Sequence, residues 1–166
     1  EMRASGRDRC EDYADKFGVP FYKGEKPWGV KVDIAMPCAT QNEVGIKEAK
    51  EIIANGTKYY IEVANMPTTE EALNLLIDTD GIIVAPSKAV NAGGVCVSGL
   101  EMSQNSQRLS WTAEEVDTKL HNAMKNIYHN SVAAAEKYGL GYNLVAGANI
   151  AGFEKVAEAM MEQGIY

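Results

Sequence analysis

The chain has 166 residues, and its 16 lysines and arginines against 23 aspartates and glutamates give a net charge of -7 at pH 7. This length is typical of one globular domain, and the acidic balance argues against nucleic acid and anionic membranes as partners, because both bind surplus positive charge. No apolar run approaches the ~20 residues of a membrane helix, and no secretory signal opens the chain. The cysteines, Cys10, Cys38 and Cys96, lie far apart without C-x-x-C spacing, which predicts no disulfide, no metal site and a cytoplasmic location.

The first half of the chain alternates short strands with helices. A helical pattern runs to Phe17 and stops at Gly18, where a glycine commonly ends a helix. Thr68, with Glu71 three residues later, has the spacing of a capping box for a further helix. The predicted strands are residues 32–36, 59–64 and 81–85, and the helices between them are residues 46–54 and 69–77. This order predicts a parallel α/β sheet with right-handed crossovers, and the apolar third strand is expected to be buried on both faces.

Beyond Pro86 the sequence pattern is helical. Residues 88–108 form the first predicted helix of this part, although each of its three glycines weakens it by up to about 1 kcal/mol relative to alanine. Thr112 as N-cap and Glu115 three residues later predict the start of a long helix that continues to Tyr138. Residues 143–163 form the last helix, and its small residues predict close packing against a neighbour: Gly147, Ala148, Ala151 and Gly152.

Three polar side chains follow the three predicted strands. Thr40 comes after the first strand, Asn65 after the second and Asn91 after the third. Because the carboxyl ends of parallel strands share one edge of a sheet, where open α/β sheets bind ligands, we expect these residues to border one cleft. Short neutral donors and acceptors suit an uncharged polar ligand, such as a ribose or a carboxamide, better than a phosphate. Asparagine and threonine are also ordinary turn residues, so turn formation is the alternative interpretation of each.

One face of the helix that follows extends this set. Asn91, Val95, Ser98 and Met102 stand at positions i, i+4, i+7 and i+11, which places them on one helix face. A serine within a helix otherwise faces solvent or bonds its own backbone, and this is the alternative for Ser98.

Other candidate groups carry no chemistry. Gly139 and Gly141 do not begin a phosphate-binding G-x-G-x-x-G motif, because Leu144 occupies the third glycine position and no strand precedes them. His121 and His129 have neither the spacing nor the neighbours of metal ligands, and we expect both to be solvated. No nucleophile with a nearby base is visible, so we assign this chain no catalytic residue and no metal.

Several long motifs are informative together. They are MPCATQN at residues 36–42, EVANMPTT at 62–69, APSKAVNAGGV at 85–95, SGLEMSQN at 98–105 and GANIAGF at 147–153, with RASGR at 3–7 and GEKPW at 24–28. In this order they resemble the carboxy-terminal part of the hexameric, bacterial-type NADP-dependent glutamate dehydrogenases, essentially from end to end. The related leucine, valine and phenylalanine dehydrogenases look different at PCATQN, which favours glutamate.

The resemblance implies an α/β fold in which residues 1–110 are the second half of an incomplete Rossmann-like domain, with a doubly wound, mainly parallel sheet. Residues 111–166 would then be helices that return toward an interdomain cleft. It implies reversible oxidative deamination of L-glutamate to 2-oxoglutarate and ammonia, with hydride transfer to NADP, or alternatively NAD, in a homo-hexamer. It assigns cofactor binding to Ala39, Thr40, Asn65 and Asn91, and substrate binding to Val95 and Ser98.

Other parts of the family's machinery have no counterpart in this sequence. The substrate domain, with the lysine and aspartate that activate the substrate, is not matched, and neither is the glycine-rich phosphate loop. We therefore expect the isolated chain to be inactive and, since it also opens on Glu1, to be a piece of a longer polypeptide. The alternative is a stand-alone α/β module that binds a nucleotide or a partner without catalysis.

Overall fold

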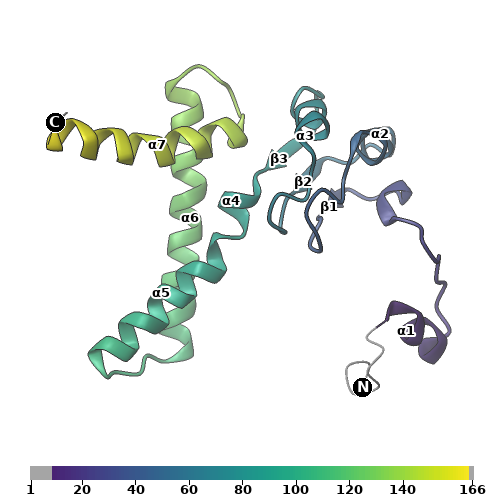
Figure 1. Ribbon diagram of the computed structural model, residues 1–166, viewed down its shortest axis with the longest axis horizontal. Helices are drawn as coiled ribbons and strands as arrows, with labels where there is room; N and C mark the ends of the chain where they lie inside the picture. Colours follow the sequence, from purple (N-terminus) through teal and green to yellow (C-terminus); the bar gives the residue numbers. More distant parts are fainter. Residues whose placement is uncertain (1–8, 165–166) are drawn as a thin grey trace.

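The computed structural model describes residues 9–164, and the first half of the chain forms a parallel three-stranded sheet, away from which the later helices extend (Figure 1). The strands β1 (Ile34–Ala35), β2 (Tyr59–Ile61) and β3 (Ile83–Ala85) lie in the order β1-β2-β3. Ile34 pairs with Tyr59, which in turn pairs with Ile83. The helices α2 (Ile46–Ala54) and α3 (Glu70–Ile77) connect the strands. The predicted parallel α/β sheet is therefore confirmed.

The strands are shorter than the predicted segments 32–36, 59–64 and 81–85. Pro37 and Pro86 follow β1 and β3, and proline cannot donate a hydrogen bond to a ladder. Beyond β2, the backbone N–H groups of Val63 and Ala64 both donate to the Pro37 carbonyl, at 3.1 and 2.9 Å. The regular ladder therefore gives way to loops at the carboxyl edge of the sheet.

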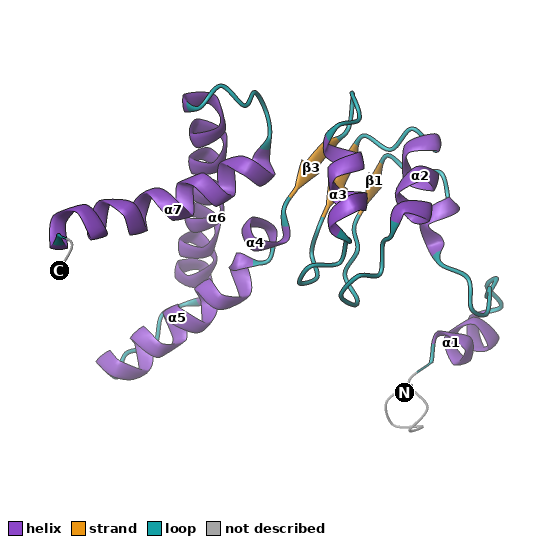
Figure 2. Cartoon of the chain, turned by 45° about the horizontal axis from the view of Figure 1, so that its top comes forward, coloured by secondary structure: helices purple, strands orange, loops and turns teal. Residues whose placement is uncertain are grey.

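One face of the sheet carries the core. Figure 2 shows α2 and α3 over the same face, as consecutive right-handed crossovers require. The buried residues of this core come from the strands, from both helices and from Trp28 in the 3-10 turn η1 (Pro27–Gly29): Trp28, Ala35, Val44, Ala49, Ile52, Tyr60, Ala72, Leu76 and Val84. On the opposite face, Ile34 and Tyr59 are exposed.

The prediction that the third strand is buried on both faces is wrong for the described part of the chain. Val84 is buried, but Ile83 and Ala85 are only half-buried. The two crossover helices cover one face, and β3 also contacts the last helix, α7 (Leu144–Gln163). The continuous apolar run of this strand therefore indicates more burial than the described helices provide.

Two helix ends were predicted in the first half of the chain, and the structure confirms one of them. The helix α1 (Cys10–Phe17) ends at Gly18 with a φ of 64°, as predicted; the residues before Arg9 lie outside the described part. The capping box predicted for Thr68 is wrong, because α3 begins after Thr69 and neither threonine caps it through its side chain. Thr68 is instead buried, and its hydroxyl shares a 2.7 Å hydrogen bond with the Tyr60 hydroxyl. Burial raises the pKa of Tyr60.

The predicted helix over residues 88–108 is two helices. The short α4 (Ser87–Val90) ends at Asn91, and α5 (Ala92–Gln107) begins directly after it. The backbone of Asn91 departs from helical geometry, its side chain is held by Asn65, and the two glycines that follow lower helix propensity. The break turns the chain away from the sheet, as Figure 1 shows.

The capping box predicted for the long helix α6 (Ala113–Lys137) is confirmed. The Thr112 hydroxyl accepts a 3.2 Å hydrogen bond from the Glu115 N–H, and the Thr112 N–H donates to the Glu115 carboxylate at 2.7 Å. This backbone donor holds the pKa of the Glu115 carboxyl below its usual range.

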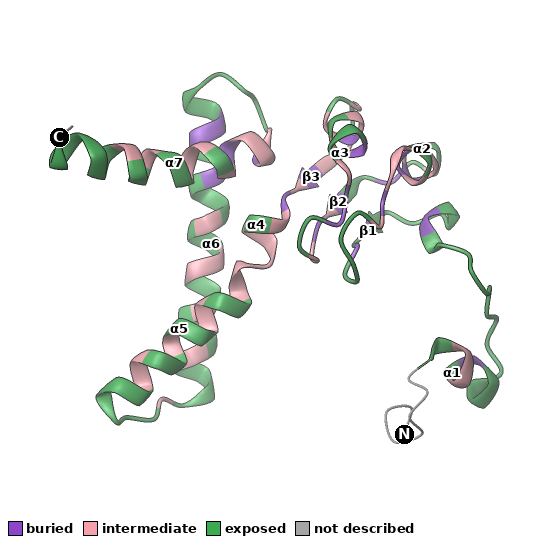
Figure 3. Ribbon diagram, in the orientation of Figure 1, coloured by how far each residue is buried: buried purple, intermediate pink, exposed green. Residues whose placement is uncertain are grey.

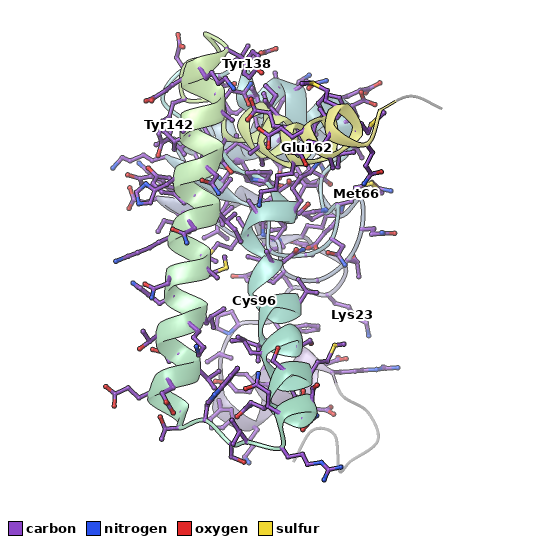
Figure 4. The ribbon with its side chains drawn as sticks, turned by 90° about the vertical axis from the view of Figure 1, so that its left-hand side faces the viewer. Lys23, Met66, Cys96, Tyr138, Tyr142 and Glu162 are labelled. Atoms are coloured by element: carbon purple, nitrogen blue, oxygen red, sulfur yellow. The ribbon has the colours of Figure 1, made fainter. Side chains whose placement is uncertain are left out.

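The helices α6 and α7 cross at a close contact that contains Gly147. A hydrogen bond links α6 to the loop that follows it: the hydroxyls of Tyr128 and Tyr142 lie 2.5 Å apart, and this bond raises the pKa of Tyr142 to about 12. Figure 4 shows Tyr138 and Tyr142 at this end of α6. Figure 3 shows that most of α5 and the outer part of α7 are exposed or half-buried.

Candidate functional site

The loops that follow β1 and β2 meet the start of α5 at the carboxyl edge of the sheet. Between them lies an open groove of about 690 Å³. Its lining comes from three places that are distant in the sequence: Cys38, Ala39, Gln41, Val63, Ala64, Asn65, Asn91 and Val95. This is the edge at which open parallel sheets bind their ligands.

The structure brings four of the six predicted site residues into this groove. Ala39, Asn65, Asn91 and Val95 line it. Thr40 is not among the lining residues, although it stands between Ala39 and Gln41, and its backbone N–H donates to Glu43 at 3.4 Å. Ser98 does not line the groove either and lies on the exposed surface of α5. The binding roles given to all six residues stay predictions.

The two asparagines of the groove form a direct pair. The Asn91 side chain amide donates to the Asn65 Oδ1 at 2.6 Å. This bond fixes the orientation of both amides, so Asn91 Oδ1 is left as an acceptor and Asn65 Nδ2 as a donor. Together they offer one acceptor and one donor without a charge. Such a pair complements a carboxamide or a sugar hydroxyl, which matches the ligand class expected from the sequence.

Backbone contacts hold the first two loops together. Asn42 and Met66 both adopt left-handed backbone conformations, with φ of 53° and 47°, and the Asn42 N–H donates to the Met66 carbonyl at 3.0 Å. Non-glycine residues rarely adopt this conformation, and they do so mainly where surrounding contacts enforce it. The two loops are thus fixed relative to each other before any ligand binds.

Sequence reasoning missed one residue that belongs to this edge. Glu62 follows β2 directly, is only 3% exposed, and accepts a 3.1 Å hydrogen bond from the Ser87 N–H at the start of α4. A carboxylate at the end of an apolar strand is the signal that identifies it, because a carboxylate is seldom fully buried without a partner.

The predicted face of α5 is open to solvent. Val95 is 73% exposed and Met102 is 71% exposed. Within residues 9–164 the Ser98 hydroxyl makes no hydrogen bond, whereas the Ser103 hydroxyl on the same helix donates to the Gly99 carbonyl at 2.9 Å. Ser98 is therefore solvent-facing and not bonded to its own backbone.

The other groups considered from the sequence do not form a site in the described part of the chain. His121 and His129 are exposed, and the His129 ring packs against Tyr128 with centroids 5.3 Å apart. Over residues 9–164 no cluster of His, Cys, Asp and Glu suited to a metal ion occurs, and the three cysteines are free. In the same range, no helix combines the length and apolar character needed to span a bilayer.

The Glutamate/Leucine/Phenylalanine/Valine dehydrogenase family matches residues 1–164. The chain belongs to this family. An NAD-specific glutamate dehydrogenase of Clostridium symbiosum is 72% identical over 99% of this chain, and an NADP-specific glutamate dehydrogenase of Haemophilus influenzae is 51% identical over 100% of this chain.

Solved structures of family members agree in fold. A glutamate dehydrogenase 72% identical to this chain superposes with a TM-score of 0.95 over 99% of the chain, and the Plasmodium falciparum enzyme, at 49% identity, with a TM-score of 0.89 over 95%. The chain covers 36% and 34% of those two structures, and 37% of the length of the Clostridium and Haemophilus relatives. The α/β, Rossmann-like fold predicted from the sequence is thereby confirmed, and the chain aligns with only part of the length of these glutamate dehydrogenases.

Proposed function

We propose that this chain supplies the nicotinamide-binding edge of a glutamate dehydrogenase, which interconverts L-glutamate with 2-oxoglutarate and ammonia. The observation that carries the proposal is the Asn65–Asn91 pair, held at 2.6 Å in the groove at the carboxyl edge of a parallel sheet. Its free acceptor and donor fit a carboxamide, the polar group of a nicotinamide ring. When bound, the dinucleotide supplies hydride transfer, and this chain binds and orients it.

The remaining roles are those that the family resemblance implies. Ala39 and Thr40 border the ribose, Val95 packs against the substrate side chain, and Ser98 bonds its distal carboxylate. Residues 1–110 are the dinucleotide-binding part, and residues 111–166 are helices that pack back toward the interdomain cleft. We propose that the protein is a cytoplasmic homo-hexamer.

The coenzyme is a nicotinamide dinucleotide, and the resemblance predicts NADP. The names of the similar proteins include NAD-specific, NADP-specific and NAD(P)-specific glutamate dehydrogenases. Titrations with both NADH and NADPH therefore belong in any test of the site.

The test uses a chimera in which this chain replaces its counterpart in the Clostridium symbiosum relative. Asn91→Ala removes the partner of Asn65 and one acceptor of the groove, so we expect the dissociation constant for NADH or NADPH to rise about tenfold. Fluorescence titration measures this constant. Asn105→Ala is the matched control, because Asn105 is an exposed asparagine in the last turn of the same helix. Equal affinity of the Asn91→Ala variant and the control would contradict the proposal.

A further inference from the structure

We infer that Glu62 is a positioning residue for the candidate dinucleotide site: its buried carboxylate fixes α4 and thereby holds Asn91 against Asn65. The inference rests on the proposed function, because it concerns the same groove. Glu62 itself does not line that groove. Its effect on a ligand must therefore pass through other residues.

Three successive hydrogen bonds connect Glu62 to the asparagine pair. The Glu62 carboxylate accepts from the Ser87 N–H at 3.1 Å, and the Ser87 carbonyl accepts from the Asn91 N–H at 2.9 Å. The Asn91 side chain then donates to Asn65 at 2.6 Å. Because Asn65 lies only three residues beyond Glu62, these bonds and the backbone between the two residues form a closed ring.

The ring spans a place where the sheet ladder ends. The Glu62 backbone N–H donates to the Ala85 carbonyl at 3.0 Å, as the last contact between the ends of β2 and β3. Pro86 follows and has no N–H, so the next donor on that chain is Ser87. The Glu62 side chain takes this donor and continues the connection across the proline.

Burial of the Glu62 carboxylate strengthens its hydrogen bond to Ser87. Glu62 is 3% exposed, and within residues 9–164 the Ser87 N–H is the one hydrogen bond its side chain accepts. A buried hydrogen bond to a charged group is stronger than a neutral surface bond, and a buried acceptor without its donor is unfavourable. The carboxylate and the first turn of α4 therefore stay together.

The position of Asn65 does not depend on Glu62 in the same way. Val63 and Ala64 donate to the Pro37 carbonyl, so the backbone ties Asn65 to the loop after β1. Asn91 lies at the junction of α4 and α5, and its backbone N–H donates to the Ser87 carbonyl of α4, the helix that Glu62 contacts. The position of Asn91 consequently depends on the Glu62–Ser87 bond more than the position of Asn65 does.

The test measures NADH affinity by fluorescence titration in the chimera described above. Glu62→Met keeps an unbranched chain of similar size but cannot accept a hydrogen bond, and we expect it to raise the dissociation constant about tenfold. Glu62→Gln keeps an acceptor oxygen and should stay within about threefold of the parent. If Glu62→Gln retains the affinity that Glu62→Met loses, the hydrogen bond is what matters and not the volume of the side chain.

A second variant breaks the same bond from the other side. Ser87→Pro deletes the donor at the first position of α4, where proline is well tolerated, and Pro86 already has the extended backbone, at φ -76° and ψ 146°, that precedes a proline. We expect Ser87→Pro to weaken NADH binding about as much as Glu62→Met does. It keeps the inference testable if Glu62→Met does not fold.

Combination with Asn91→Ala decides whether Glu62 acts through Asn91. In that background, Glu62→Met and Ser87→Pro should each change the NADH dissociation constant by less than about twofold. The inference would be overturned if the effects of Glu62→Met and Asn91→Ala on the NADH dissociation constant were fully additive, or if neither Glu62→Met nor Ser87→Pro changed that constant. Either result would leave the proposed site intact. No effect of Asn91→Ala alone would overturn the proposed site, and the inference with it.

Discussion

Replacing Gly147 by alanine is expected to lower the free energy of unfolding by about 2 kcal/mol or more, although alanine favours a helix by about 1 kcal/mol over glycine. A Cβ at this position would lie 2.0 Å from the Ser131 carbonyl oxygen and 2.9 Å from its carbon. Both are backbone atoms of α6, so no side chain rotation relieves the clash. The two helices must separate, which exposes the buried Ala135 beside Gly147. Urea unfolding of the 166-residue chain, followed by circular dichroism, measures the loss.

The same helix offers a matched control for this prediction. A Cβ at Gly152 meets no atom of residues 9–164 within 4 Å. Gly152→Ala should therefore stabilise the chain by up to about 1 kcal/mol through helix propensity alone. A Gly147→Ala variant as stable as Gly152→Ala would show that α6 and α7 do not cross where the structure places them.

Ser98→Ala is expected to lower kcat/KM for glutamate by about ten- to a hundredfold in the chimera, because a charge-assisted bond to the distal carboxylate is worth roughly 1.5–3 kcal/mol. The hydroxyl is free to make that bond, since it faces solvent and makes no hydrogen bond within residues 9–164. Affinity for the dinucleotide should barely change. Steady-state kinetics with glutamate and with norvaline, which lacks the distal carboxylate, measures the effect.

A second serine on the same helix provides the control. The Ser103 hydroxyl already donates to the Gly99 carbonyl, so Ser103→Ala should leave kcat/KM for both substrates unchanged. Norvaline should be turned over equally by the parent and by Ser98→Ala. An equal loss for glutamate and norvaline would rule out the carboxylate contact.

The parts of the fold that local chemistry determines could be predicted from the sequence. Alternation of short apolar segments with helical ones predicted the parallel sheet, and the Thr112 and Glu115 pair predicted the start of α6. Gly147 was one of four small residues predicted to pack closely, and its approach to Ser131 bears this out, whereas a Cβ at Gly152 would meet no described atom within 4 Å. Each of these signals depends on neighbours within a few positions or on simple periodicity.

The errors occur where distant contacts override local pattern. Thr68 has the spacing of a helix cap, but its hydroxyl is used by Tyr60 from the neighbouring strand. The break at Asn91 depends on a side chain bond to Asn65, 26 residues away. The role of Glu62 is not visible in the local sequence, because its partner, Ser87, is 25 residues away. For the candidate site, strand-end positions predicted the edge, whereas the connections within it required coordinates.

We expect the nicotinamide end of a dinucleotide to bind between Asn65 and Asn91 at the carboxyl edge of the sheet. A crystal structure of the chimera with bound NADH would locate it. The nicotinamide carboxamide should lie in the groove lined by Ala39, Asn65, Asn91 and Val95, within hydrogen-bond distance of both asparagines. A nicotinamide ring elsewhere, such as the 440 Å³ cavity beside Asp80 and Tyr142 near the start of β3, would contradict it.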